Sequence, residues 1–197
     1  MCTVTRPAGS ACRRRGRCRH EDPHLIAAAC TASDPDARHG HAENAIWDEY
    51  ARSLVAFPRT WLSLEEGAMV LAEEIDEVWD EVRANHIGLA QKEAAQVGAM
   101  ALRLIADLYE HSPDPLQRGR IAADEVHLAG PLVGPRGRAL ASSHEGIGFL
   151  KREFDALWSA VRFDDPAREL AARVGAASVR FIAETTSARA ALAVSGR

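Results

Sequence analysis

The stretch LAEEIDEVWDEVR, at residues 71–83, decides the fold because it recurs as LKREFDALWSAVR at residues 150–162. In both stretches apolar residues recur at intervals of three and four, which is the spacing of one buried face of an α-helix. They are Leu71, Ile75, Val78 and Val82 in the first stretch and Leu150, Phe154, Leu157 and Val161 in the second. Each stretch also follows an S-x-x-E capping box, a pattern that marks the start of a helix. The two boxes are Ser63 with Glu66 and Ser142 with Glu145.

A second pair of matching segments follows these stretches. Residues 97–106 read VGAMALRLIA and residues 174–183 read VGAASVRFIA, so we infer a tandem duplication. We predict the second helix of each copy at 89–109 and 166–185, with Pro166 at the first helical position. Because one helical hairpin cannot bury its own apolar face, the sequence predicts an all-α helical bundle. We expect it to be built from two duplicated helical hairpins related by pseudo-two-fold symmetry.

The remaining segments set the expected boundaries. We expect a basic leader at 1–42, a first module at 43–112, a linker at 113–141 and a second, degenerate module at 142–197. Additional helices are expected near 43–55 and, within the linker, near 120–128. Trp79 and Trp158 share their helices with the apolar stripes, so we expect them to anchor the bundle core or the contact between the modules.

Charge is unevenly distributed along the chain. The net charge of the 197 residues is −4, but residues 1–19 contain six arginines and no acidic residue. The rest of the chain carries 18 basic and 28 acidic residues, which argues against nucleic acid as a partner. No apolar run approaches the ~20 residues that span a bilayer, and residues 25–30 are too short for a signal peptide. We therefore expect a cytoplasmic protein without a membrane partner.

The leader contains all four cysteines of the chain. A zinc site built from Cys18, His20, Cys30 and His39 is one interpretation, although the spacing matches no known zinc motif. The alternative interpretation is a mobile basic tail, or an overlong assignment of the start codon.

Acidic residues crowd the first repeated helix. On a helical wheel Glu74, Glu77 and Glu81 form a band beside the apolar stripe, close enough for their charges to repel. On the next helix Glu93 shares the wheel position of the apolar core residues, with Gln96 one turn further on. A buried carboxylate must be paired or metal-bound, and oxygen ligands suit Mg²⁺ or Mn²⁺. The alternative is a solvated acidic face with Glu93 complementing the helix dipole.

The spacing of these residues resembles a known family. Glu73-Glu74-x-x-Glu77, followed after fifteen intervening residues by Glu93-x-x-Gln96, is similar to the pattern of MazG-like proteins in the all-α nucleoside triphosphate pyrophosphohydrolase superfamily. The family pattern is E-x-x-E and then E-x-x-D, on a helical bundle that usually dimerises. The resemblance covers residues 63–108 well and the second copy in fold only.

The resemblance implies a function and a set of roles. Such proteins use Mg²⁺ to hydrolyse a nucleoside triphosphate to the monophosphate and pyrophosphate. By this resemblance Glu74, Glu77, Glu93 and Gln96 would hold Mg²⁺ or Mn²⁺, and Glu73 would act as the catalytic base or an accessory ligand. Gln96 departs from the pattern, because an amide coordinates a metal without contributing negative charge. A non-enzymatic interaction or nucleotide-sensing module is therefore the competing function.

The second copy has lost most of these acids. Arg152, Ala156, Leu170 and Arg173 stand opposite Glu73, Glu77, Glu93 and Gln96, and only Glu153 and Asp155 remain acidic. One hypothesis is that Arg152 and Arg173 bind a phosphate group. The alternative is that Arg152 pairs with a neighbouring acid and the second copy is a scaffold.

The sequence also excludes other enzyme classes. No glycine-rich phosphate loop is present, and no Ser-His-Asp or Cys-His set stands out. The histidines of the body, His86, His111, His127 and His144, are expected in loops or at helix ends. Two fused copies allow either a monomer with an internal pseudo-dimer or a homodimer.

Overall fold

The computed structural model describes residues 34–185, and within this range every regular element is an α-helix. The helices are α2 (Pro35–Ala56), α3 (Leu64–Arg83), α4 (Ile87–Leu108), α5 (Pro115–Val133), α6 (Ser143–Phe163) and α7 (Arg168–Glu184). The predicted all-α bundle is therefore confirmed. None of these helices is both long enough and apolar enough to cross a bilayer.

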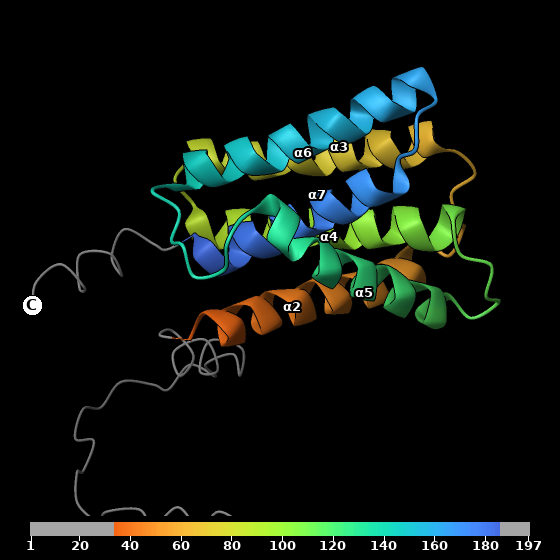
Figure 1. The fold of residues 1–197 in the computed structure, drawn as a ribbon, viewed down its shortest axis with the longest axis horizontal. Coiled ribbons are helices and arrows are strands. Elements are labelled where there is room, and N and C mark those ends of the chain that lie inside the picture. The colour runs from red at the N-terminus through yellow and green to blue at the C-terminus, as the bar shows by residue number, and fades with distance from the viewer. Residues whose placement is uncertain (1–33, 186–197) are drawn as a thin grey trace, which may run out of the picture.

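The helices stack in three layers of two (Figure 1). α3 lies beside α6, α4 beside α7, and α2 beside α5, with the α4 and α7 pair in the middle. The middle helices are the most completely buried, because other helices pack on them from both sides. The two predicted apolar stripes of α3 and α6 face this middle layer and are buried throughout.

Both predicted capping boxes are present. The Ser63 hydroxyl accepts a hydrogen bond from the Glu66 amide at 3.2 Å, and Ser142 accepts one from Glu145 at the same distance. In return the Glu66 carboxylate accepts from the Leu62 amide at 3.0 Å. These reciprocal bonds fix the starts of α3 and α6 where the sequence places them.

Three expected boundaries are wrong. α2 begins at Pro35, so the last residues of the expected leader at 1–42 belong to the fold. α5 has 19 residues instead of the nine expected, so most of the segment at 113–141 is a full bundle helix and not a linker. Both helices begin with an Asp-Pro cap that the sequence analysis overlooked. Pro166 precedes the cap of α7 instead of occupying its first turn, because the N-cap is Ala167.

The helix contacts follow a regular pattern. Exchanging α2 with α5, α3 with α6 and α4 with α7 leaves the set of contacting helix pairs unchanged. Gly98 of α4 meets Ile46 of α2, and Gly175 of α7 meets Val126 of α5 in the same way. Each half of the described chain therefore has three helices, one more than the hairpin that the sequence predicted. The duplication itself stays an inference from the sequence.

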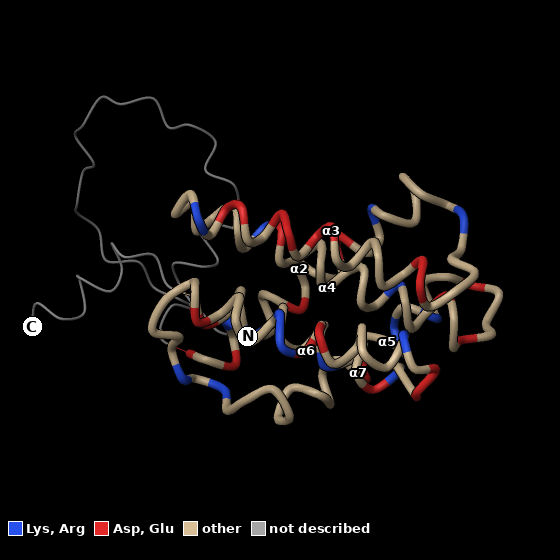
Figure 2. Tube along the Cα trace, turned by 90° about the horizontal axis from the view of Figure 1, so that it is seen from above, with Lys and Arg blue, Asp and Glu red and all other residues tan. Residues whose placement is uncertain are grey.

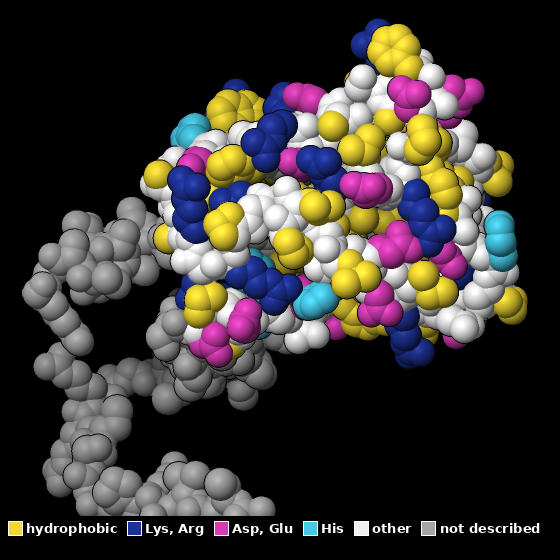
Figure 3. Space-filling view, in the orientation of Figure 1, with side chains coloured by type: hydrophobic (Ala, Val, Ile, Leu, Met, Phe, Trp, Pro, Cys, Tyr) yellow, Lys and Arg dark blue, Asp and Glu magenta, His cyan; other side chains and the backbone are white. Residues whose placement is uncertain are grey.

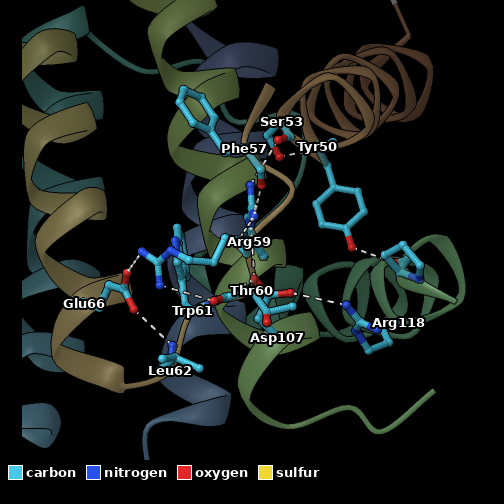
Figure 4. Close-up of polar contacts among 12 residues, drawn as sticks. Tyr50, Ser53, Phe57, Arg59, Thr60, Trp61, Leu62, Glu66, Asp107 and Arg118 are labelled. Carbon is cyan, nitrogen blue, oxygen red and sulfur yellow. Dashed lines mark hydrogen bonds and ion pairs between the residues drawn. The ribbon is translucent and has the colours of Figure 1, made fainter. Parts of the chain in front are cut away.

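Two buried arginines extend this correspondence. Arg103 of α4 donates to the carbonyl oxygen of Ser53, in the last turn of α2, at 3.1 Å and to that of Arg59, beyond the end of α2, at 2.7 Å; Ser53 and Arg59 are labelled in Figure 4. Arg180 of α7 donates to the carbonyl oxygen of Val133, at the end of α5, at 2.6 Å. In this way each arginine donates to carbonyl groups at or just after the C-terminal end of a helix in the neighbouring layer.

Around Arg103, the side chain of Asp107 accepts from the Trp61 amide at 3.1 Å and lies 3.5 Å from Arg118. The Tyr50 hydroxyl donates to the Pro115 carbonyl oxygen at 2.7 Å (Figure 4). These contacts tie α2 to α4 and α5.

The tryptophans divide between two roles. Trp158 packs against the apolar core, as expected. Trp79 is 38% exposed and lies outside the core, so of the two expected roles it has the contact between the modules. It packs edge-on against His144 of α6, with ring centroids 5.6 Å apart, and so contacts the other half of the chain. His127 also differs from expectation, because it lies inside α5, 2.8 Å from the Glu43 carboxylate.

Candidate metal centre

Three carboxylates from α3 and α4 meet on one side of the bundle. Glu74 and Glu77 lie one turn apart on α3, and Glu93 reaches them from the first half of α4. One oxygen atom from each side chain can be chosen so that all three lie within 4.8 Å of one another. The side chain of Glu93 is only 13% exposed, so it turns toward α3 and not toward bulk water. Figure 2 shows the series of acidic positions along α3.

The α3–α4 hairpin brings these residues together. α3 ends at Arg83 and α4 begins at Ile87, with Asn85 in the left-handed backbone conformation that allows so short a turn. The chain therefore reverses directly, and positions near the middle of α3 face the first turns of α4. Glu93 meets α3 here because it shares a helix face with the buried residue Val97.

The other two predicted site residues, Gln96 and Glu73, differ in their relation to the cluster. Gln96 contacts the cluster, because its side-chain amide donates a hydrogen bond to the Glu93 carboxylate. Glu73 is exposed and lies outside the group of three. Glu81, the third member of the expected acidic band, lies 2.9 Å from His86 and is also outside it. The structure thus brings together Glu74, Glu77, Glu93 and Gln96.

The negative charges of the cluster repel one another. The pKa of Glu74 is raised from 4.5 to about 7, chiefly by burial and then by the negative charges of Glu77, Glu93, Glu49 and Glu73. Within the described residues no basic side chain forms an ion pair with Glu74 or Glu77. The nearest compensation is Lys92, an exposed side chain that lies 3.3 Å from Glu93. The cluster is therefore short of positive charge.

Glu49 of α2 is an acidic neighbour that the sequence analysis missed. Its side chain is 19% exposed and pairs with Arg52, which is 68% exposed. Its charge contributes to the raised pKa of Glu74, which places it beside the cluster. The only sequence signal is its spacing, three residues after the buried Ile46 on the helix that packs against α4. That signal becomes readable only once the packing of α2 is known.

The donor set fits a hard divalent cation. All the candidate ligand atoms are oxygens, and Mg²⁺ and Mn²⁺ prefer carboxylate oxygens and retain bound water. Three carboxylates from two helices leave coordination positions for water or a phosphate group. The alternative, a solvated acidic face, accounts for Glu77, which is exposed. It accounts less well for Glu74 and Glu93, because both are partly buried.

The corresponding region of the second half contains a salt bridge. Glu153 of α6 is 1% exposed, and its two oxygens are taken by different arginines. Arg152 donates to one oxygen at 3.0 Å and 3.2 Å, and Arg173 of α7 donates to the other at 2.6 Å and 2.9 Å. Of the two alternatives for these arginines, the structure therefore shows pairing with a neighbouring acid.

The zinc interpretation stays a prediction, because three of its four residues are not among those that the structure describes. Cys18, His20 and Cys30 lie outside the described residues. His39 is buried in the first turns of α2, with one ring nitrogen 2.9 Å from the Pro35 carbonyl oxygen and the other 3.6 Å from the Glu184 carboxylate. Both of its nitrogens thus face oxygen atoms of the chain.

These features define an all-α protein with one acidic cluster, formed by its first half, among the described residues. In comparisons with known proteins, no family model, no curated protein and no solved structure matches this chain. The similarity to MazG-like proteins thus depends on the spacing of the acidic residues alone.

Proposed function

We propose that Glu74, Glu77 and Glu93 bind Mg²⁺ or Mn²⁺ and that the chain is a metal-dependent nucleoside triphosphate pyrophosphohydrolase. The observation that carries the proposal is the convergence of three carboxylates, with oxygens within 4.8 Å of one another, around a Glu74 whose pKa is raised to about 7. Their mutual repulsion costs stability in the absence of a cation, and a divalent cation would relieve it.

Each residue of the site would have a definite role. Glu74, Glu77 and Glu93 would hold the ion, which would neutralise phosphate charge and lower the pKa of a bound water. Gln96 donates a hydrogen bond to Glu93 and would offer its carbonyl oxygen as a weak ligand. Glu73 is exposed beside the cluster, where its carboxylate would accept a proton from the attacking water. The products would be the nucleoside monophosphate and pyrophosphate.

A second function is favoured by one observation. Gln96 occupies the position where the family pattern has an acid, and its amide is engaged as a donor to Glu93. A site with three acids instead of four binds cations more weakly, which suits a module that senses a nucleotide without hydrolysing it. In either case we propose a cytoplasmic protein that acts as a monomer with an internal pseudo-dimer, or as a homodimer.

Pyrophosphate release over a panel of nucleoside triphosphates, with Mg²⁺ or Mn²⁺, tests the proposal. We expect activity in the wild-type chain, loss of at least a hundredfold in Glu74→Gln, and no loss in Asp76→Asn, an exposed acid on the same helix outside the cluster. Activity that appears only in Gln96→Asp would favour the nucleotide-sensing module. Equal activity of Glu74→Gln and the wild type would remove the cluster from the mechanism.

A further inference from the structure

The second half of the chain contains a buried acid held by two arginines at the place where the first half gathers its carboxylates. We infer that Arg173 is a cation built into the chain, which takes in the second half the place of the divalent cation of the first half. In the second half the guanidinium group of Arg173 thus neutralises the buried acid, so no metal ion is needed there. This inference depends on the proposed metal centre only for the identity of the ion that the arginine replaces.

The positions correspond by structural landmarks. Glu74 and Glu153 each lie eleven residues after the serine that caps their helix, Ser63 or Ser142. Glu153 is the only buried acid of α6, and Glu74 is half-buried in α3. Glu153 is therefore the counterpart of Glu74.

The partner helix gives the same result. Gln96 and Arg173 each lie two residues before a glycine, Gly98 or Gly175, and each glycine receives an aliphatic side chain from the neighbouring helix. Both side chains reach back toward the acids of their own half, Gln96 to Glu93 and Arg173 to Glu153. Arg173 on α7 therefore approaches Glu153 from the helix that corresponds to α4, which carries Gln96 and Glu93 in the first half.

The chemistry of the second half is that of a neutralised site. A carboxylate that is 1% exposed is costly unless it is paired, and Glu153 gives one oxygen to each arginine. The side chain of Arg173 is 31% exposed and that of Arg152 is 60% exposed, so Arg173 is the more enclosed cation. Arg173 also joins α6 to α7, whereas Arg152 is adjacent to Glu153 on the same helix.

The other members of the cluster have been replaced together. Ala156 and Leu170 stand where the first half has Glu77 and Glu93. The described part of the second half accordingly contains no group of three acids able to hold a metal. With one acid and two guanidinium groups, a divalent cation has no charge to attract it. Each chain should therefore have one metal centre, formed by its first half.

Rebuilding the second half tests this inference. The first centre is disabled by Glu74→Gln with Glu77→Gln, so that the result is independent of whether that centre binds metal. In this background the chain carrying Ala156→Glu, Leu170→Glu and Arg173→Gln is titrated with Mn²⁺, by calorimetry and by the electron paramagnetic resonance of free Mn²⁺. The matched control carries Ala156→Glu and Leu170→Glu but keeps Arg173.

We expect the rebuilt chain to bind Mn²⁺ at a stoichiometry of one and the control to bind at least tenfold more weakly. Equal affinities in the two chains, or a folded rebuilt chain that does not bind, would overturn the inference. Titration of the wild-type chain, run separately, tests the first centre alone. Failure there with success in the rebuilt chain would refute the proposed function and leave only the part of the inference that concerns the second half, in which Arg173 occupies a position where a cation can bind.

A second measurement remains if the rebuilt chain does not fold. Arg173→Gln alone leaves the carboxylate of Glu153 short of charge, so we expect its melting temperature to fall by roughly 5 °C or more. Adding Glu153→Gln should restore most of that loss, because the unpaired charge is gone. A loss that Glu153→Gln deepens would show that Arg173 serves packing and not charge neutralisation, and would overturn the inference.

Discussion

Glu74→Gln should stabilise the metal-free protein and at the same time abolish its response to metal. The pKa of Glu74 is about 7 in the folded protein, whereas the ordinary value of 4.5 applies to the unfolded chain. Between these values the folded state holds a proton that the unfolded state has lost. The unfavourable contribution is therefore absent below pH 4.5, grows through this window and is complete above pH 7.

The size of the effect follows from the shift. At full weight a pKa raised from 4.5 to about 7 would cost roughly 3 kcal/mol. Glu74 is only half-buried, so solvent screening reduces the cost to about 1 to 2 kcal/mol. For a chain of this length that corresponds to an increase of roughly 2 to 8 °C in the melting temperature of Glu74→Gln at pH 8. At pH 5, just inside this window, the increase should be roughly a quarter as large.

Thermal unfolding followed by circular dichroism measures both parts of the prediction. The wild type, Glu74→Gln and the control Asp76→Asn are melted at pH 5 and pH 8, with chelator or with Mn²⁺. At a Mn²⁺ concentration about 100 times its dissociation constant, the wild type should gain about 2.7 kcal/mol. Glu74→Gln should gain little, and Asp76→Asn should follow the wild type.

Two results would refute this reasoning. If Glu74→Gln lowers the melting temperature at pH 8 in chelator, the carboxylate is satisfied by the fold and the cluster is not strained. If wild type and Glu74→Gln gain equally from Mn²⁺, the ion binds elsewhere.

Three further predictions concern Gln96, Glu49 and Gly98. Gln96→Asp should raise Mn²⁺ affinity about tenfold in calorimetry and lower the stability of the metal-free protein, because it adds a charge and removes a donor; unchanged affinity would contradict this. Glu49→Gln should weaken Mn²⁺ binding two- to fivefold, about 0.5 to 1 kcal/mol for a nearby charge, and a loss as large as that of Glu74→Gln would make it a direct ligand. Gly98→Ala should cost roughly 1 to 2 kcal/mol in denaturant unfolding, because the new methyl group would lie 2.5 Å from Ile46; a stabilised variant would show that α2 can move away.

The sequence was informative wherever a local rule decides the structure. The starts of α3 and α6 follow from their capping serines, and the apolar stripes follow from helical periodicity, so both were predicted correctly. The meeting of Glu93 with Glu74 was also predictable, because a short hairpin fixes which turns of two neighbouring helices face each other. These features depend on residues close together in the chain.

Features that depend on distant parts of the chain were missed. α5 has a weak apolar stripe, and the glycines and proline around Gly130 and Pro131 resemble a linker, although Pro131 lies inside the helix. What holds α5 in place is its packing on α7, where Val126 fills the space at Gly175, and the bond from Arg180 to its last residue. Glu49 was missed for the same reason, since the position of α2 depends on α4.

The two halves act as an internal control for the role of the acids. Both halves have the same capping serines, the same glycine contacts and the same buried arginines at the ends of helices. Only the first half gathers carboxylates, whereas in the second half a single buried acid is neutralised by two arginines. The acids are therefore not needed to form this arrangement of helices, and the raised pKa of Glu74 is what burial beside other acids produces. A group of carboxylates that this arrangement of helices does not require supports the proposal that the first half binds a cation.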